Sequence, residues 1–186
     1  LEGMGWLFGI GIATLAGLVV LGGITRIGRV TEKLIPAMIL VYLAGCGAVL
    51  VVHLDALPGA VALIVSSAFS GEAAAGGVIG ALIAGFQRAA FSNEAGLGSA
   101  PIAHSAVKTN HPATEGLVAL WEPFIDTVIV CTATALMVVV TGAWKIEGME
   151  GVAITSSAFA TVFDWFPYVL TVAVFLFAFS TMLTWA

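Results

Sequence analysis

The chain has 186 residues, of which 60% are hydrophobic and 9% charged, and its formal net charge is −5. A soluble domain usually carries about 25% charged residues, so this composition excludes a water-soluble globular domain and indicates an integral membrane protein. The alternating pattern of a membrane β-barrel is absent, and the 22 glycines favour close helix packing in lipid. The predicted fold class is all-α, with several membrane-spanning helices.

In chain order, five apolar stretches are long enough to cross a bilayer, which takes about 20 helical residues. We expect them to form a single transmembrane domain over residues 1–186. The predicted spans cover residues 6–23, 34–52, 59–85, 117–141 and 167–186.

Basic residues gather in two of the connections between these spans. Five of the six lie at 24–33 and 86–116, and only Lys145 lies at 142–166. Because cytoplasmic loops carry the excess of Lys and Arg, we expect 24–33 and 86–116 inside the cell and 53–58 and 142–166 outside. The five are Arg26, Arg29, Lys33, Arg88 and Lys108.

Two further predictions concern the start of the second span and the connection 86–116. A second span that begins near Leu34 places Pro36 in the first turn of its helix, where a missing N–H is harmless. The connection 86–116 is polar but keeps apolar pairs, which predicts a structured loop with an interfacial helix from about Ser99 to Thr109.

The third span contains a carboxylate, Glu72, close to its centre. An ionisable group at membrane depth is costly, and it normally faces a polar cavity or a partner. The neighbouring pairs Ser70-Gly71 and Gly76-Gly77 predict an interruption of the helix that exposes backbone groups to a solute. The alternative is that Glu72 pairs with another helix and the glycines are packing contacts.

Two further polar groups lie in the fourth and fifth spans. Ser180 and Thr181 are deep in the last span, where hydroxyls either bond to helix carbonyls or bind a hard cation. Trp185, one turn beyond Thr181, shares its helix face. Glu122 and Asp126 share a face of the fourth span. We expect Glu122 to meet cytoplasmic water or to pair with Arg88 or Lys108, and the role of Asp126 stays open.

Other functional classes find no support in the chain. The three histidines form no ligand cluster with Cys46 or Cys131, there is no nucleophile–base pair, and no basic stripe suggests a nucleic acid. We expect a protein that is not an enzyme and has no cofactor. The chain begins at Leu1 and ends inside an apolar run, which we interpret as an internal fragment of a longer protein.

Five short motifs in chain order resemble the alanine or glycine:cation symporter family. The longest, GFQRAAFSNEAGLGSAPIAH, looks like the signature loop of that family. Together the motifs extend over nearly the whole chain. They are Gly22–Ile27, Ser67–Ala74, Gly85–His104, Pro123–Thr127 and Phe177–Met182.

The resemblance implies sodium-coupled symport of a small neutral amino acid, alanine or glycine, by a multi-pass protein of the plasma (inner) membrane. It also implies the leucine-transporter-type fold, with two inverted five-helix repeats. The five spans then correspond to about helices 4 to 8, and the third span is the broken sixth helix. The partners that the resemblance implies for the protein are the amino acid, a sodium ion as the coupling ion, and the lipid bilayer. The alternative is a channel-like or non-transporting membrane subunit.

The same resemblance implies which residues form the site. Ser180 and Thr181 are expected to bind sodium or to adjoin its ligands. The expected substrate-binding residues are Phe69, Ser70, Gly71, Glu72, Thr181 and Trp185.

Glu72 departs from the family pattern, which usually has Gln at this position. Gln donates and accepts hydrogen bonds, whereas an ionised Glu only accepts. Either Glu72 stays protonated in the working cycle, or it changes substrate preference or adds pH dependence. Which amino acid is carried, whether protons replace sodium, and the oligomeric state stay open.

Overall fold

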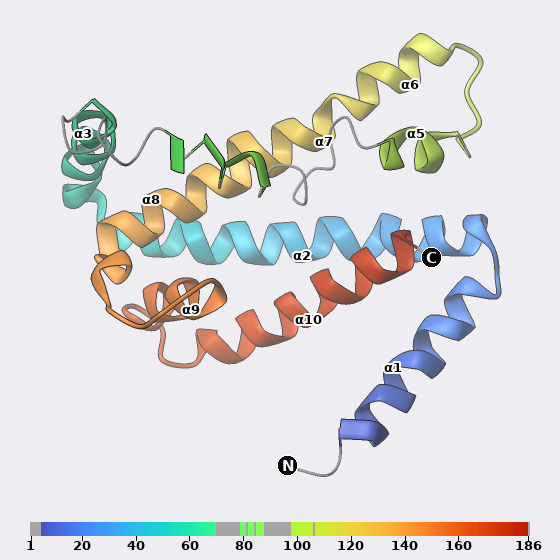
Figure 1. Ribbon diagram of the computed structural model, residues 1–186, viewed down its shortest axis with the longest axis horizontal. Helices are drawn as coiled ribbons and strands as arrows, with labels where there is room; N and C mark the ends of the chain where they lie inside the picture. Colours follow the sequence, from blue (N-terminus) through green and yellow to red (C-terminus); the bar gives the residue numbers. More distant parts are fainter. Residues whose placement is uncertain are drawn as a thin grey trace. The chain divides into compact units, whose positions relative to one another are not determined.

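The computed structural model describes residues 5–69, 79–80, 82–83, 85–87, 98–105 and 107–185. Every regular element within these residues is helical, which confirms the all-α fold class (Figure 1). The elements are α1 (Gly5–Val20), α2 (Ile24–Val52), η1 (Leu54–Ala56), α3 (Leu57–Ala68), α5 (Ser99–His104), α6 (Pro112–Ala119), α7 (Trp121–Pro123), the π-helix η3 (Phe124–Cys131), α8 (Thr132–Thr141), η4 (Ala143–Lys145), α9 (Val152–Ala160) and α10 (Phe166–Thr184).

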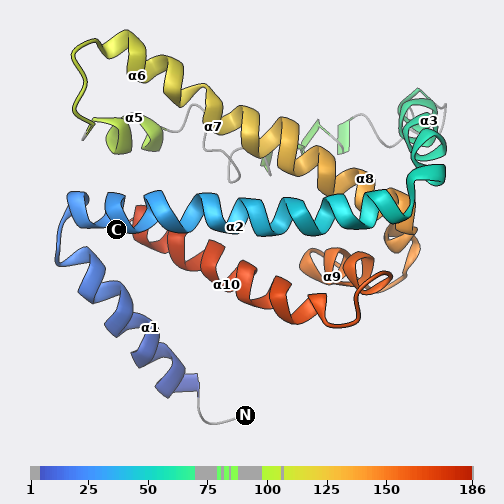
Figure 2. The same cartoon turned by 180° about the vertical axis from the view of Figure 1, so that it is seen from behind.

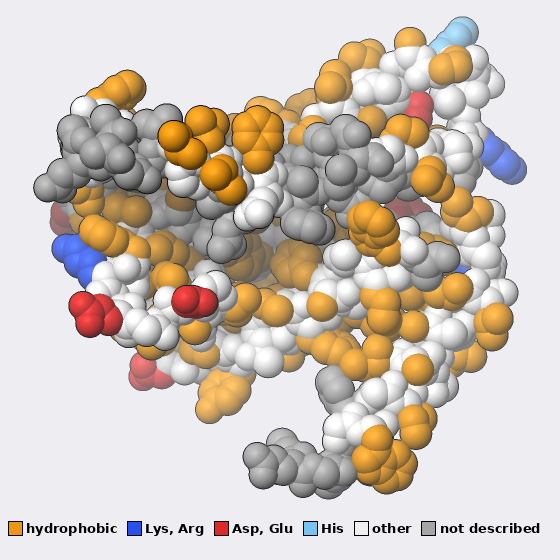
Figure 3. All heavy atoms as spheres, viewed as in Figure 1, with side chains coloured by type: hydrophobic (Ala, Val, Ile, Leu, Met, Phe, Trp, Pro, Cys, Tyr) orange, Lys and Arg blue, Asp and Glu red, His pale blue; other side chains and the backbone are white. Residues whose placement is uncertain are grey.

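Three helices in the described part of the chain are long and apolar enough to cross a membrane. They are α2, the helical run Pro112–Thr141, and α10. Two shorter apolar helices, Gly5–Val20 and Leu54–Ala68, accompany them. Hydrophobic side chains cover much of the face shown in Figure 3, and charged ones are few. Such an apolar surface suits contact with lipid or with further helices.

The chain divides into two compact units. The first comprises Leu1–Tyr42 and Val169–Ala186, and the second comprises Leu43–Tyr168. The prediction of a single transmembrane domain, with the orientation given above, stays a prediction.

Within the first unit, the first half of α2 and most of α10 lie side by side (Figures 1 and 2). Apolar side chains from both helices line a cavity of about 200 Å³. Leu170 and Leu183 of α10 are almost fully buried. The lining residues are Leu34, Ala37, Met38, Val41, Val169, Val172, Ala173 and Leu176.

Within the second unit, the core includes buried side chains from the end of α2, from α8 and from α9. The side chains of Cys46, Val49, Met137 and Phe159 are fully buried. The rings of Phe159 and Phe166 lie 4.2 Å apart between centroids. A Cβ added to Gly45 would lie 2.3 Å from Cζ of Phe166, so only glycine lets α2 approach these rings so closely.

The turn between α1 and α2 explains the motif Gly22–Ile27 in structural terms. Gly23 has φ +73°, a left-handed conformation that suits glycine. The Arg26 guanidinium donates a hydrogen bond to the carbonyl of Leu18 at 3.0 Å. A Cβ on Gly22 would lie 2.0 Å from Cδ of Arg26, so glycine leaves room for this side chain. Arg26 thereby satisfies a carbonyl at the end of α1.

The second helix begins ten residues before the predicted span, because the segment expected as a connection at 24–33 is helical. Its apolar residues Ile24, Ile27 and Val30 recur at helical spacing, so the segment forms an amphipathic start to α2. The placement of Pro36 in a first turn was therefore wrong. Pro36 lies inside α2 and cannot donate a hydrogen bond to the carbonyl four residues earlier.

The second half of the connection 86–116 also differs from its prediction. The helix predicted from Ser99 to Thr109 ends at His104. The Thr109 hydroxyl accepts a hydrogen bond from the N–H of His111, which forms a turn before Pro112. Pro112 is the first residue of α6, so the helical run starts earlier than the predicted span 117–141. Proline favours this position because its N–H would have no partner there.

Two other segments are more structured than a plain span or connection. The π-helix Phe124–Cys131 directly follows Pro123. Membrane helices accommodate a proline through such local widening of the hydrogen-bond pattern. The predicted connection 142–166 contains α9, whose Ala158 and Phe159 are fully buried.

Candidate functional site

The hydroxyl pair Ser180 and Thr181 lies near the C-terminal end of α10. The Ser180 side chain is only 5% exposed, whereas Thr181 is exposed. Both hydroxyls donate to the carbonyl of Phe177, each at 2.9 Å. These are the bonds that membrane-helix hydroxyls commonly make, and they use only the hydroxyl proton.

The oxygen lone pairs of both hydroxyls remain available after these bonds form. A hydroxyl that donates its proton can still accept hydrogen bonds or bind a cation through oxygen. Sodium is a hard cation that prefers such oxygen ligands. The pair is therefore chemically suited to sodium, although each oxygen is also accounted for by ordinary helix bonding.

The aromatic residues of the predicted site lie at helix ends. The backbone N–H of Trp185 donates to the carbonyl of Thr181 at 3.1 Å, and its side chain is 61% exposed. In the other unit, Phe69 follows the last residue of α3 and is 87% exposed. Ser180, Thr181 and Trp185 thus share the last turns of one helix, and Phe69 is described only within its own unit.

The central segment of the predicted site, Ser70, Gly71 and Glu72, lies outside the described residues. The adjoining helix α3 ends at Ala68, and the N–H of Phe69 bonds to the carbonyl of Ser66. The described helix thus ends just before the predicted interruption. The roles of these three residues stay predictions.

The fourth span carries Glu122 on α7 and Asp126 in the π-helix. Asp126 is half-buried and takes part in an interaction within the structure. Glu122 is 57% exposed, in line with contact with water, but its described partner is neither Arg88 nor Lys108. Its Oε2 lies 3.7 Å from Nε2 of His104. The exposure of Glu122 thus agrees with the water alternative of the prediction, while no ion pair with Lys108 is found among the described residues and Arg88 lies outside them.

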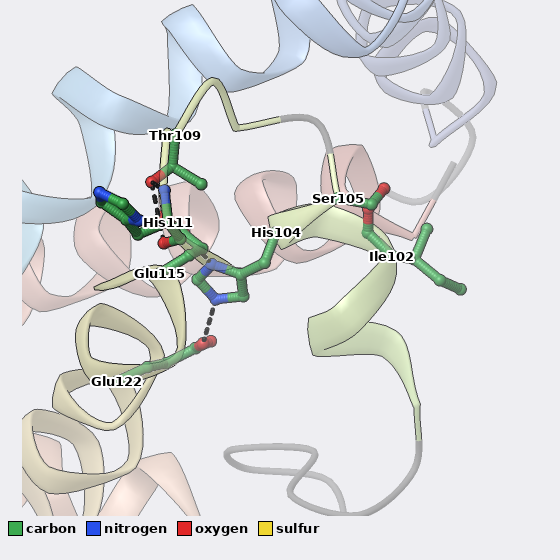
Figure 4. Close-up of polar contacts among 7 residues, drawn as sticks. All are labelled: Ile102, His104, Ser105, Thr109, His111, Glu115 and Glu122. Atoms are coloured by element: carbon green, nitrogen blue, oxygen red, sulfur yellow. Dashed lines mark hydrogen bonds and ion pairs between the residues drawn. The ribbon is translucent and has the colours of Figure 1, made fainter. Parts of the chain in front are cut away.

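His104 lies between two carboxylates (Figure 4). Its Nδ1 is 2.5 Å from Oε1 of Glu115, and its Nε2 faces Glu122. The exposed fractions of the His104 and Glu115 side chains are 27% and 17%. The short distance and partial burial make the contact with Glu115 the stronger of the two.

Sequence reasoning missed this cluster, although a signal for it was present. Glu115 and Glu122 are seven residues apart, which is two turns of a helix and places them on one face. A helix starting at Pro112 was needed to recognise that spacing. In the sequence, His104 lies at the end of the longest motif and in no ligand cluster, and no partner was predicted for it.

Together, the long apolar helices and the hydroxyl pair define a helical membrane protein with oxygen groups suited to a small cation. Comparison with known families identifies the class further. The model of the sodium:alanine symporter family matches residues 2–186. The chain belongs to this family, a family of transporters rather than enzymes, and the predicted family is confirmed.

Curated relatives agree on the class and differ in their named substrates. The transporter YflA of Bacillus subtilis, named as uncharacterised, is 42% identical over 94% of this chain and 39% of its own length. The sodium/alanine symporter AgcS of Methanococcus maripaludis is 37% identical over 96% of this chain and 40% of its own. The probable sodium/glutamine symporter GlnT of Bacillus subtilis is 34% identical over 94% of this chain and 37% of its own length. The chain thus spans about two fifths of the length of these relatives.

Proposed function

We propose that the whole protein carries out sodium-coupled symport of a small neutral amino acid, alanine or glycine, across the plasma membrane. The observation that carries the proposal is the match of the sodium:alanine symporter model to residues 2–186. The inward sodium gradient drives uptake, and the membrane potential adds about 2.3 kcal/mol per charge for each 100 mV.

The choice of alanine or glycine rests on the family and on one named relative. AgcS is named a sodium/alanine symporter, whereas GlnT is named for glutamine. Alanine and glycine are small enough for a site formed by short side chains such as Ser70 and Gly71. A larger substrate such as glutamine is the competing outcome of the uptake experiment.

For the mechanism, we propose a leucine-transporter-type arrangement in which the described helices are part of two inverted repeats. The third predicted span is interrupted at Ser70-Gly71-Glu72, and the last span is α10. Solute and sodium bind near the midplane, and one helix group rocks against the other to alternate access.

Within this site, the proposed roles follow the chemistry of each side chain. Ser180 and Thr181 offer oxygens to sodium, an assignment supported by their available lone pairs and by the burial of Ser180. Thr181 also adjoins the substrate. The other proposed substrate-binding residues are Phe69, Ser70, Gly71, Glu72 and Trp185.

Uptake by the whole protein in proteoliposomes tests the function. With an inward sodium gradient, labelled alanine or glycine should accumulate and saturate, and replacing sodium by choline should abolish accumulation. In separate experiments, labelled glutamine replaces alanine or glycine as the solute, and an inward proton gradient replaces the sodium gradient. Non-saturable flux without accumulation would overturn symport and favour a channel-like subunit.

The sodium assignment is tested on α10 itself. Ser180→Ala and Thr181→Val remove one hydroxyl each, and they should raise the sodium concentration needed for half-maximal uptake by about tenfold. Thr171→Val, the same change about three turns earlier on α10, is the matched control. An unchanged sodium dependence in both site variants would contradict the assignment.

The role of Glu72 is tested with Glu72→Gln, which restores the usual family residue. If Glu72 sets substrate preference or pH dependence, uptake against pH and the ranking of alanine, glycine and glutamine should change. Identical pH profiles and rankings in the two proteins would eliminate a special role for this carboxylate.

A further inference from the structure

The cluster around His104 joins α5 to the next two helices along the chain, α6 and α7. His104 is the last residue of α5, while Glu115 lies in the first turn of α6 and Glu122 in α7. Both ring nitrogens face a carboxylate oxygen, at 2.5 Å and 3.7 Å. Figure 4 shows the imidazole ring between the two acidic side chains.

A charged imidazole suits this geometry better than a neutral ring does, because both ring nitrogens face a carboxylate oxygen. A neutral ring has one N–H, so its second nitrogen would direct a lone pair at a carboxylate. The imidazolium donates a hydrogen bond from Nδ1 to Glu115, and its charge also attracts the Glu122 carboxylate 3.7 Å from Nε2. A proton on His104 therefore strengthens both contacts at once, and its loss leaves the two carboxylates without another cation among the described residues.

Other charged groups around the cluster do not replace His104. It is the only titratable residue of α5, and α6 and α7 contribute only the two glutamates. Lys108 and His111, in the connection between α5 and α6, form no ion pair with either glutamate in the described part of the chain. Among the described residues, His104 is thus the one basic side chain next to both carboxylates.

Apolar packing contributes little to holding α5. Ile102, the largest apolar side chain of this helix, is 68% exposed. The Ser105 hydroxyl bonds back to the carbonyl of Ile102, within the end of α5 itself. The contacts of His104 are therefore the main side-chain attachment of α5 to the helical run Pro112–Thr141 in the described residues.

We propose that protonated His104 is a positioning residue of the transport cycle, which fastens α5 to the start of the run Pro112–Thr141. The run continues from this attachment into the π-helix with Asp126. Because α5 closes the longest family motif, loss of the attachment frees the end of that segment. This proposal rests on the proposed function for its effect on transport, and on the contacts alone for the attachment.

The transport test uses the whole protein in proteoliposomes between about pH 5 and 9, a range that brackets the titration of histidine side chains. Uptake should fall as pH rises. His104→Gln should lower the maximal rate about tenfold at low pH, as expected for the loss of the one charged hydrogen bond to Glu115, with KM for amino acid and sodium nearly unchanged. His104→Arg keeps the charge and several donors, so it should retain the rate and remove the fall.

His111→Gln is the matched control, because it changes the neighbouring histidine and should leave the wild-type profile intact. A wild-type rate that does not vary with pH would overturn the positioning role. The same conclusion follows if His104→Gln keeps the wild-type profile, or if His104→Arg shows the same fall.

A second measurement needs no transport. Spin labels at Ile102→Cys and Leu117→Cys, both exposed at 68% and 65%, report the separation of α5 and α6. The distance distribution should be narrow at low pH and broad at high pH in the wild type. It should be broad throughout in His104→Gln and narrow throughout in His104→Arg. A distribution insensitive to pH and to both variants would overturn the attachment, whereas absent amino acid uptake with the expected distances would overturn only the proposed function.

Discussion

The helical run Pro112–Thr141 is held in different ways at its two ends. At its start, the contacts of His104 with Glu115 and Glu122 attach a short, exposed helix. At its end, α8 lies against α3 and α9, and Met137 and Phe159 are fully buried. Close apolar packing responds little to pH or salt, whereas a charged contact responds to both. We therefore expect the packing at the end of the run to change little with pH and salt, and the contacts at its start to change with both.

The largest expected effect comes from removing the buried ring of the apolar end. Phe159→Ala deletes a fully buried side chain in contact with Phe166 and should lower the free energy of unfolding by about 3 kcal/mol. Chemical unfolding in detergent measures it. Tyr168→Ala, at an aromatic side chain that is 77% exposed, should cost far less. Equal losses in the two variants would mean that the apolar end is no anchor.

The second largest expected effect on stability comes from the close approach of α2 to the ring of Phe166, next to Phe159. Gly45→Ala places a Cβ 2.3 Å from Cζ of Phe166 and should cost about 1–3 kcal/mol through overpacking. At Gly47 nothing lies within 4 Å of an added Cβ. Gly47→Ala should therefore stabilise α2 by up to about 1 kcal/mol. Thermal unfolding midpoints that move in the same direction would contradict this assignment.

At the charged end, the two glutamates should differ. Glu115→Gln removes the shorter, less exposed contact and should speed hydrogen exchange of the α5 amides about tenfold. Glu122→Gln removes a contact at 3.7 Å from a side chain that is 57% exposed, so its effect should stay within about twofold. The reverse order would show that the short contact does not hold α5.

Salt gives the smallest expected effect and distinguishes the two ends directly. Raising ionic strength from about 0.1 to 1 M shortens the screening length from about 10 to 3 Å. Exchange of the α5 amides should then rise by about twofold at most, because the Glu115 contact is partly shielded from solvent. The cost of Phe159→Ala should not change. A salt-dependent cost at Phe159 would weaken the contrast.

Three of the predicted spans overlap helices long and apolar enough to cross a membrane, but hydropathy did not locate the ends of those helices. The chain from Ile24 to Lys33 is too polar for the hydrocarbon core, yet α2 includes it. A change from apolar to polar side chains indicates where a helix leaves the lipid. The helix itself does not end there, because its backbone hydrogen bonds also form in the membrane interface. The same reason explains why the fourth helical run starts at Pro112 and not at residue 117.

The candidate site divides in a similar way. Ser180 and Thr181 were singled out in the sequence by the motif Phe177–Met182, which resembles the symporter family, since other hydroxyls such as Thr171 also lie in the apolar spans. That both bond to one carbonyl, and that only Ser180 is buried, depends on the packing of α10. The partner of Glu122 was missed, because a contact with His104 requires α5 to turn back toward α6.

By itself, the sequence determined the class of membrane protein, the family and the stretches suited to lipid, since these follow from composition and from short motifs read along the chain. Only the tertiary structure decided that Gly45 admits the rings of Phe159 and Phe166, and that His104 bridges Glu115 and Glu122. Both contacts join residues from different helices, and their geometry depends on where each helix begins and turns.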